Sequence, residues 1–137
     1  MKIAFIAHPI GCDVENNLKR ICEIVRLVNL TEPNTVPFVP YYADCVALND
    51  ATPEERERGI ANDKELFFRE GLIDEVRLYG DKGITRGMAA EIKLAWHMGI
   101  TVTCMTPETQ EAYSLFIKEH LHVNEKYFGS SNKHSEM

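Results

Sequence analysis

The feature that most constrains the fold is an N-terminal run of apolar side chains, Ile-Ala-Phe-Ile-Ala, at residues 3–7. A run without polar alternation is typical of a parallel strand that is buried on both faces of a sheet. The run ends in a turn at residues 8–11 that contains a proline and a glycine, after which Asp13 can cap a helix. The apolar stripe predicted for this helix consists of Leu18, Ile21, Cys22, Val25 and Val28.

Strands and helices are predicted to alternate along the rest of the chain. The predicted strands are residues 36–41, 75–79 and 100–105, and the predicted helices are residues 52–70, 86–99 and a segment that starts at 106–107. Residues 43–51 are expected to form an irregular connection. This order predicts an α/β fold, a flavodoxin-like three-layer sandwich with a parallel sheet of four or five strands in the approximate order 2-1-3-4.

The length of 137 residues corresponds to one domain, which we expect to span residues 1–122, followed by a polar tail at residues 123–137. Apolar residues make up 45% of the chain and charged residues 26%, as in soluble globular proteins. The net charge of −6 argues against nucleic acid as a partner, because binding to a phosphate backbone needs a basic surface.

The sequence lacks the motifs of several common classes of functional site. No G-x-G-x-x-G, P-loop or G-x-S-x-G pattern occurs, and no His/Cys/Asp spacing indicates a metal, so neither a metal nor a cofactor is expected. No apolar run approaches the length of a membrane span, and no leader pattern opens the chain. We expect a reduced, cytoplasmic protein with four free thiols, Cys12, Cys22, Cys45 and Cys104.

The predicted topology places a crevice between strands 1 and 3, lined by residues 8–13 and 80–87. Glu91 follows in the helix after the second of these loops, and Gly87, one turn earlier on the same face, leaves its carboxylate unshielded. Alternatively, Glu91 is a solvated glutamate near Lys82 or Lys93. Glycines in both loops favour the crevice interpretation.

Two further carboxylates are candidates for the same chemistry. Asp63 shares one side of its predicted helix with Ile60 and Phe67, and Asp74 directly precedes the third strand. Asp63 is alternatively an ordinary surface aspartate. Chemistry that uses carboxylates without a metal is chiefly glycosyl transfer, in which a carboxylate attacks an anomeric carbon.

Several segments together resemble the nucleoside 2-deoxyribosyltransferase-like superfamily over roughly residues 3–105. The most specific is Arg-Gly-Met-Ala-Ala-Glu at residues 86–91, followed by a glycine and an apolar strand at 99–102; residues 58–63 and 74–79 add to it. The resemblance implies that Glu91 is the nucleophile that takes up the sugar at C1 and that Asp74 helps to hold the nucleoside. It also implies that the loop from His8 through Pro9 to Gly11 lies against the base or sugar, and that the protein is a homo-oligomer.

The sequence departs from the superfamily pattern at two positions. An aspartate often found six residues before the glutamate is replaced by Thr85, and a tyrosine after the first strand is replaced by His8. Thr85 and Arg86 at a helix start favour a 5′-phosphate, because the amide groups and the helix dipole attract an anion there.

We therefore expect a nucleoside or nucleotide N-glycosidase or 2-deoxyribosyltransferase with Glu91 as nucleophile. Either His8 or Asp63 would manage the proton of the base, and His8 is favoured because its ordinary pKa suits transfer near neutrality. Gly87 and Met88 complete the expected binding residues. The alternative is a nucleotide-binding protein without catalysis, and a third hypothesis is a structural domain that acts through partners. A homodimer or higher oligomer is expected to bury the apolar groups of residues 41–48 and 127–128.

Overall fold

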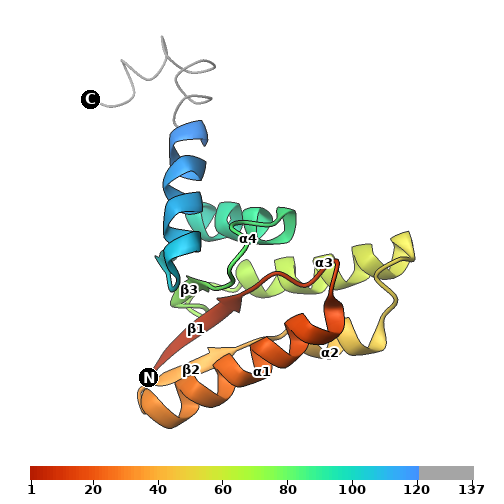
Figure 1. The fold of residues 1–137 in the computed structure, drawn as a ribbon, viewed down its shortest axis with the longest axis horizontal. Coiled ribbons are helices and arrows are strands. Elements are labelled where there is room, and N and C mark those ends of the chain that lie inside the picture. Colours follow the sequence, from red (N-terminus) through yellow and green to blue (C-terminus); the bar gives the residue numbers. More distant parts are fainter. Residues whose placement is uncertain (121–137) are drawn as a thin grey trace.

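The computed structural model describes residues 1–120, in which strands and helices alternate (Figure 1). The strands are β1 (Lys2–Ala7), β2 (Thr35–Phe38), β3 (Glu75–Leu78) and β4 (Thr101–Cys104). The labelled helices are α1 (Val14–Thr31), α2 (Tyr42–Ala47), α3 (Pro53–Phe67) and α4 (Arg86–His97). Residues 107–120 are also helical.

The four strands form one parallel sheet in the order β2-β1-β3-β4, which confirms the predicted fold class and strand order. In the register, Phe5 of β1 lies opposite Phe38 of β2 and Val76 of β3. The order reverses direction between β1 and β3, so the carboxyl ends of these two strands meet at the switch point of the fold.

One face of the sheet packs into an aromatic core around Phe5. Its ring lies 4.9 Å from that of Phe67 in α3, 5.7 Å from Tyr41 and 6.3 Å from Phe38, measured between centroids. Val76 and Leu78 of β3 and three residues of α4 join the same buried cluster, the last being Met88, Ile92 and Ala95. Burial of this apolar surface positions α3 and α4 over the sheet.

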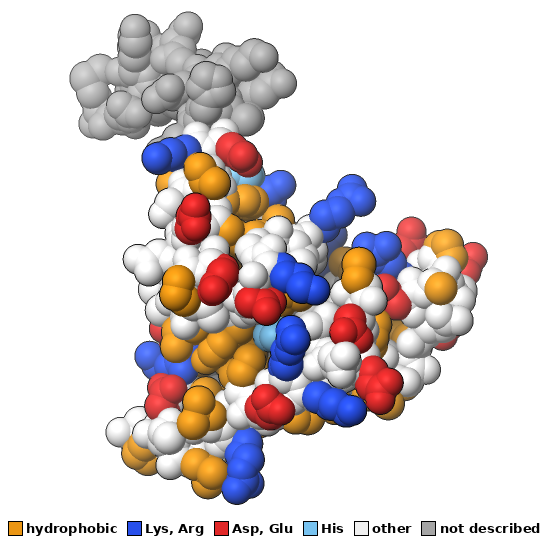
Figure 2. All heavy atoms as spheres, viewed as in Figure 1, with side chains coloured by type: hydrophobic (Ala, Val, Ile, Leu, Met, Phe, Trp, Pro, Cys, Tyr) orange, Lys and Arg blue, Asp and Glu red, His pale blue; other side chains and the backbone are white. Residues whose placement is uncertain are grey.

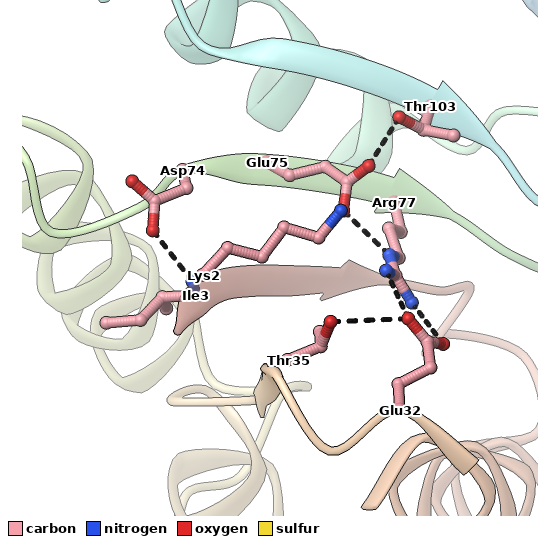
Figure 3. Close-up of polar contacts among 8 residues, drawn as sticks. All are labelled: Lys2, Ile3, Glu32, Thr35, Asp74, Glu75, Arg77 and Thr103. Atoms are coloured by element: carbon pink, nitrogen blue, oxygen red, sulfur yellow. Dashed lines mark hydrogen bonds and ion pairs between the residues drawn. The ribbon is translucent and has the colours of Figure 1, made fainter.

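The other face carries a polar network around Arg77, which is 4% exposed (Figure 3). Its guanidinium donates two hydrogen bonds to Glu32 at the end of α1, at 2.7 and 2.8 Å, and one to Glu75 at 2.8 Å. Glu75 also accepts from Thr103 at 2.7 Å and lies 3.2 Å from the ammonium of Lys2. The network joins α1, β1, β3 and β4, and opposite charges meet throughout it.

Three sequence predictions for element bounds are wrong. The second strand ends at Phe38 instead of residue 41, α3 ends at Phe67 instead of residue 70, and residues 42–47 form α2 instead of an irregular connection. The cause of the second-strand error is the hydroxyl of Tyr41, which donates a 2.6 Å hydrogen bond to the Ile6 carbonyl and brings the ring into the core. Tyr41 is only 6% exposed, so the prediction that it awaits a partner is also wrong.

The helix of residues 107–120 stands beside α4 (Figure 1). It begins with a cap in which the Thr106 hydroxyl accepts from the Thr109 amide at 3.1 Å. Trp96 of α4 donates from its indole to the Tyr113 hydroxyl at 2.9 Å and packs against Phe116, with the ring centroids 5.4 Å apart. The predicted tail at residues 123–137, with its aromatic pair, lies outside the described residues.

The surface mixes charges of both signs, and a group of hydrophobic side chains lies between α1 and the helix of residues 107–120 (Figure 2). Within residues 1–120, none of the helices combines the length and the apolar character that crossing a bilayer requires.

Candidate functional site

The loops after β1 and β3 are in direct contact at the switch point. Gly80 has a φ of +107°, and a Cβ atom at this position would lie 2.8 Å from Cδ of Pro9. Only glycine combines this backbone conformation with so close an approach. The Gly80 carbonyl also accepts from the Thr106 hydroxyl at 2.7 Å, which holds the loop from its other side.

His8 is buried at the end of β1, where its Nδ1–H donates a 2.7 Å hydrogen bond to the Pro9 carbonyl. This bond leaves Nε2 as the free ring atom, and in the neutral ring that atom is an acceptor. Burial is the largest cause of a lowered His8 pKa, so the neutral ring is favoured. The Gly11 end of the same loop is held by Asn17, whose amide donates to the Ile10 carbonyl at 3.0 Å.

Glu91 is carried by α4, whose start has the features expected from the sequence. The Thr85 hydroxyl accepts from the Met88 amide at 3.3 Å, so Thr85 is the N-cap. A Cβ atom at Gly87 would meet no atom within 4 Å, so the space over this turn is open. Arg86 is exposed, whereas the side chain of Met88 is 1% exposed and belongs to the core.

Asp63 of α3 and Glu91 of α4 lie close enough for their charges to interact. Burial, followed by the charge of Asp63, raises the pKa of Glu91 well above its ordinary value. Burial, followed by the charge of Asp44, raises the pKa of Asp63 to about 7. Oδ1 of Asp63 is buried and has no hydrogen-bond partner among the described residues. Such a pair holds a proton near neutral pH, as acids and bases in active sites do.

Three residues at this site were not expected from the sequence, and all belong to the segment around α2. Tyr41 interacts electrostatically with Glu91 and Asp63, and burial raises its pKa well above the ordinary value. Burial, followed by Asp63, raises the pKa of the Cys45 thiol to about 11. Asp44 accepts a 3.0 Å hydrogen bond from Asn62, the residue next to Asp63. The sequence in and around this six-residue helix gives no signal that these three residues belong to a site.

Asp74 does not lie at the switch point. It directly precedes β3, at the amino end of that strand, where its carboxylate accepts from the Ile3 amide at 2.8 Å and its own amide donates to the Ile3 carbonyl at 2.9 Å. Parallel strands place their amino ends at the opposite edge of the sheet from the switch point. In the structure, Asp74 therefore aligns β1 with β3.

Two open grooves lie away from the carboxylate pair. One, of about 590 Å³, separates α1 from α2 and is lined mainly by apolar side chains such as Ile21, Val25 and Tyr42. The other, of about 380 Å³, lies at the amino edge beside Asp74 and Gly99. Across residues 1–120, no three His, Cys, Asp or Glu side chains are grouped to hold a metal ion.

Comparison with known proteins gives one solved structure and one family. The structure is a 2-desoxiribosyltransferase from Leishmania mexicana, with 19% sequence identity and a TM-score of 0.49. The match covers 77% of this chain and 64% of that one. No curated protein matches the sequence. Residues 2–105 match the model described as "Domain of unknown function (DUF7768)", and the chain belongs to this family.

Proposed function

We propose that this protein cleaves the bond between base and sugar in a nucleoside or nucleotide, as an N-glycosidase or 2-deoxyribosyltransferase. The observation that carries the proposal is the electrostatic interaction of Asp63 in α3 with Glu91 in α4, together with the buried Asp63 Oδ1 that has no hydrogen-bond partner among the described residues. Glycosyl transfer needs two carboxyl groups in different protonation states, one ionised and one protonated. The resemblance of the sequence to the nucleoside 2-deoxyribosyltransferase-like superfamily supports the same chemistry.

In the proposed reaction the proton that burial keeps on Glu91 passes to Asp63 as the substrate binds, and the Glu91 carboxylate then attacks C1 of the sugar and forms a glycosyl ester. The electron pair of the breaking C–N bond passes to the base, and the proton of Asp63 moves to the same ring nitrogen. Water or a second base then attacks C1, returns a proton to Asp63 and releases Glu91 as a carboxylate. The open space over Gly87 is the path by which the sugar reaches Glu91.

His8 has a different role in this proposal from the one favoured by its ordinary pKa. A neutral imidazole whose Nδ1–H is bonded to Pro9 has no proton to give from Nε2. We assign Nε2 as an acceptor for a hydroxyl of the sugar or an N–H of the base. Asp63, with a pKa of about 7, is the proton donor.

The test is a chromatographic assay for free base, with a panel of nucleosides and their 5′-monophosphates. Wild-type protein should release base, and Glu91→Gln should abolish release because the covalent step is lost. Glu108→Gln, a change to an exposed carboxylate outside the crevice, is the matched control and should retain wild-type activity. Release of base by Glu91→Gln at the wild-type rate would refute the assignment of the nucleophile.

A second candidate function is binding of a nucleotide without cleavage. It is favoured by the raised pKa of Glu91, because a protonated carboxyl group is a hydrogen-bond donor and a poor nucleophile. Calorimetry with the same panel separates the two functions, since a binding protein gives a stable complex and no free base.

We also propose that the protein is a homo-oligomer. The crevice of a single sheet is open, and a reactive sugar cation needs protection from water. Leu27 and Leu30 of α1 are 62% and 67% exposed and offer apolar surface for a second copy. Sedimentation velocity at micromolar concentration should give at least a dimer, and a monomer that turns over substrate would refute the proposal.

A further inference from the structure

Thr106 connects the last described helix to the loop after β3. Residues 2–105 match the family model, so Thr106 and the helix that it begins lie just beyond the match. The Thr106 hydroxyl donates a 2.7 Å hydrogen bond to the Gly80 carbonyl, and the Met105 amide donates to the Leu78 carbonyl at 2.9 Å. The end of β4 and the start of the last helix therefore hold the chain that leaves β3 at two points.

A chain of contacts leads from Thr106 to the imidazole ring of His8. Gly80 packs so closely on Pro9 that a Cβ atom at Gly80 would lie 2.8 Å from Cδ of the proline. The Pro9 carbonyl in turn accepts the His8 Nδ1–H at 2.7 Å. A carbonyl can only accept, so this contact requires the proton on Nδ1 and leaves Nε2 as the acceptor. The tautomer of His8 therefore depends on the position of Pro9, which packs against the residue that Thr106 holds.

The Thr106 hydroxyl has two separate hydrogen-bonding roles. As an acceptor it caps its helix, because the Thr109 amide donates to it at 3.1 Å while the Thr106 amide donates to the Thr109 hydroxyl at 3.2 Å. As a donor it supplies one proton, and the Gly80 carbonyl at 2.7 Å is nearer than the Thr109 hydroxyl at 2.9 Å. Other good N-cap residues, including aspartate, can perform the capping role. The donor role needs a proton, which an ionised carboxylate does not have.

We propose that Thr106 is a positioning residue, which holds Gly80 against Pro9 and thereby keeps His8 in the Nδ1–H tautomer with Nε2 free to accept from the ligand. The proposal rests on the proposed function, because the tautomer has a role only if Nε2 accepts from the sugar or base. Without the Thr106 donor, the Gly80 carbonyl loses its partner and the loops after β1 and β3 can separate. The His8 ring is then no longer restricted to one tautomer, and Nε2 carries the proton in part of the molecules.

The test observes the tautomer directly, without a ligand. The full chain is labelled with ¹⁵N in its histidine rings, and the imidazole nitrogen shifts are recorded by NMR at about pH 8, where His8 is neutral because burial lowers its pKa. His8→Gln identifies the His8 signals. In the wild type, Nδ1 should have the shift of a protonated nitrogen and Nε2 that of an unprotonated one. In Thr106→Asp, both shifts should move toward the average of the two tautomers.

Three variants separate the donor role from the capping role. Thr106→Ser retains both roles and should give wild-type His8 shifts, whereas Thr106→Ala loses both. Thr106→Asp caps the helix but cannot donate to Gly80, so its His8 shifts should resemble those of Thr106→Ala. Wild-type shifts in Thr106→Asp would show that Thr106 only caps its helix, and averaged shifts in Thr106→Ser would show that the hydroxyl is not what positions the loop. Either result would overturn the proposal.

The matched control is Thr52→Asp at the start of α3. Thr52 also precedes a proline at a helix start, but its side chain makes no capping hydrogen bond. This variant adds the same charge as Thr106→Asp without removing a donor to Gly80, so the His8 shifts should remain those of the wild type. Averaged shifts in Thr52→Asp would attribute the effect to the added charge and would also overturn the proposal.

Activity supplies the second measurement. If Nε2 of His8 accepts from the ligand, kcat/KM for base release should fall by about tenfold in Thr106→Asp, as expected for the loss of one hydrogen bond, and should be retained in Thr106→Ser. Averaged shifts with an unchanged kcat/KM would show that Nε2 does not accept from the ligand, which would overturn the proposal.

The NMR result also separates this proposal from the proposed function. Wild-type His8 shifts in Thr106→Asp overturn the positioning role of Thr106 whether or not the protein is an enzyme. Averaged shifts in Thr106→Asp, together with a wild type that releases no base from any nucleoside or 5′-monophosphate, instead overturn the proposed function. The two failures are therefore distinguishable.

Discussion

Two clusters of ionisable side chains in this small domain differ in how their charges are paired. Around Arg77, every charge meets an opposite charge and hydrogen bonds fill the network. Around Asp63, carboxyl groups face one another and a buried oxygen has no partner among the described residues. The first arrangement holds α1 to the sheet. The second arrangement is costly to folding once its carboxyl groups are ionised, and such an arrangement points to binding or catalysis.

The largest expected effect on stability comes from removing Arg77, the cation at the centre of the first cluster. Arg77→Met should lower the free energy of unfolding by about 3 kcal/mol, because Glu32 and Glu75 then keep their charges without a partner. Chemical denaturation at pH 7 measures the loss. The control is Arg69→Met, which removes an exposed pair with Glu65 and should cost less than about 1 kcal/mol. Equal losses in the two variants would mean that the Arg77 network contributes no more than a surface pair.

Removal of a charge from the Asp63 cluster should instead raise the free energy of unfolding. The pKa of Asp63 is about 7 in the folded chain against an ordinary 3.8, so its favourable contribution is complete below pH 3.8 and is lost as the pH rises to about 7. Asp63→Asn should therefore raise the free energy of unfolding at pH 8 by about 2 kcal/mol and abolish base release. Unfolding curves at pH 4 and pH 8 measure the difference. Glu57→Gln, at an exposed position of the same helix, should change neither.

Lower stability of Asp63→Asn at pH 8 would show that the carboxylate has a stabilising partner, and the contrast between the clusters would fail. The stability contributed by the Arg77 cluster has the reverse dependence on pH, because hydrogen bonds from Arg77 lower the pKa of Glu32. Its contribution is present above the ordinary glutamate pKa and is lost as the pH falls.

The fold could be predicted well because its signals are local. The uninterrupted apolar run of β1 requires burial on both faces, and Thr85 with Gly87 marks the start of the helix that carries Glu91. The candidate site could be predicted only in part. Asp44 lies in a helix too short to show a period, and its interaction with Asp63 depends on how α2 packs on α3.

Two other residues, Arg77 and Asp74, lie where the sequence interpretation did not place them. A charged residue inside a four-residue strand usually faces solvent, so Arg77 gave no signal that it is buried, and its partner Glu32 is 45 residues away. Asp74 was a candidate both as a carboxylate before the third strand and by resemblance, although a residue directly before a parallel strand lies at the edge of the sheet opposite the switch point.

The charge of the ligand gives a smaller test of the same contrast. If the Asp63 cluster belongs to a nucleotide site, the phosphate group must bind away from the negative charge of this cluster. The start of α4 with Arg86 offers such a place. 5′-Monophosphates should bind about tenfold more tightly than nucleosides, and Arg86→Ala should remove most of the difference. Calorimetry with matched pairs measures the ratio. Lys93→Ala, later on α4, is the control, and equal affinity for both ligand classes would identify free nucleosides as the ligands.

The smallest expected effect on folding is at Gly87. Gly87→Ala should raise the free energy of unfolding by about 0.5 to 1 kcal/mol, because alanine is the better helix former and its Cβ meets no atom. The same methyl group should weaken ligand binding, since it occupies the approach to Glu91. Thermal unfolding and ligand titration on one sample measure both effects. Unchanged affinity would mean that the ligand does not pass over this turn.

The contact between Gly80 and Pro9 also has a consequence for the rate of binding. Because the backbone of one loop packs against the proline ring of the other, we expect the two loops to move together. A ligand that binds at these loops should then meet a preformed surface, and solvent viscosity should affect its association rate through diffusion alone. Gly80→Ala should push the two loops apart, and stopped-flow measurements should then show a slow conformational phase before binding.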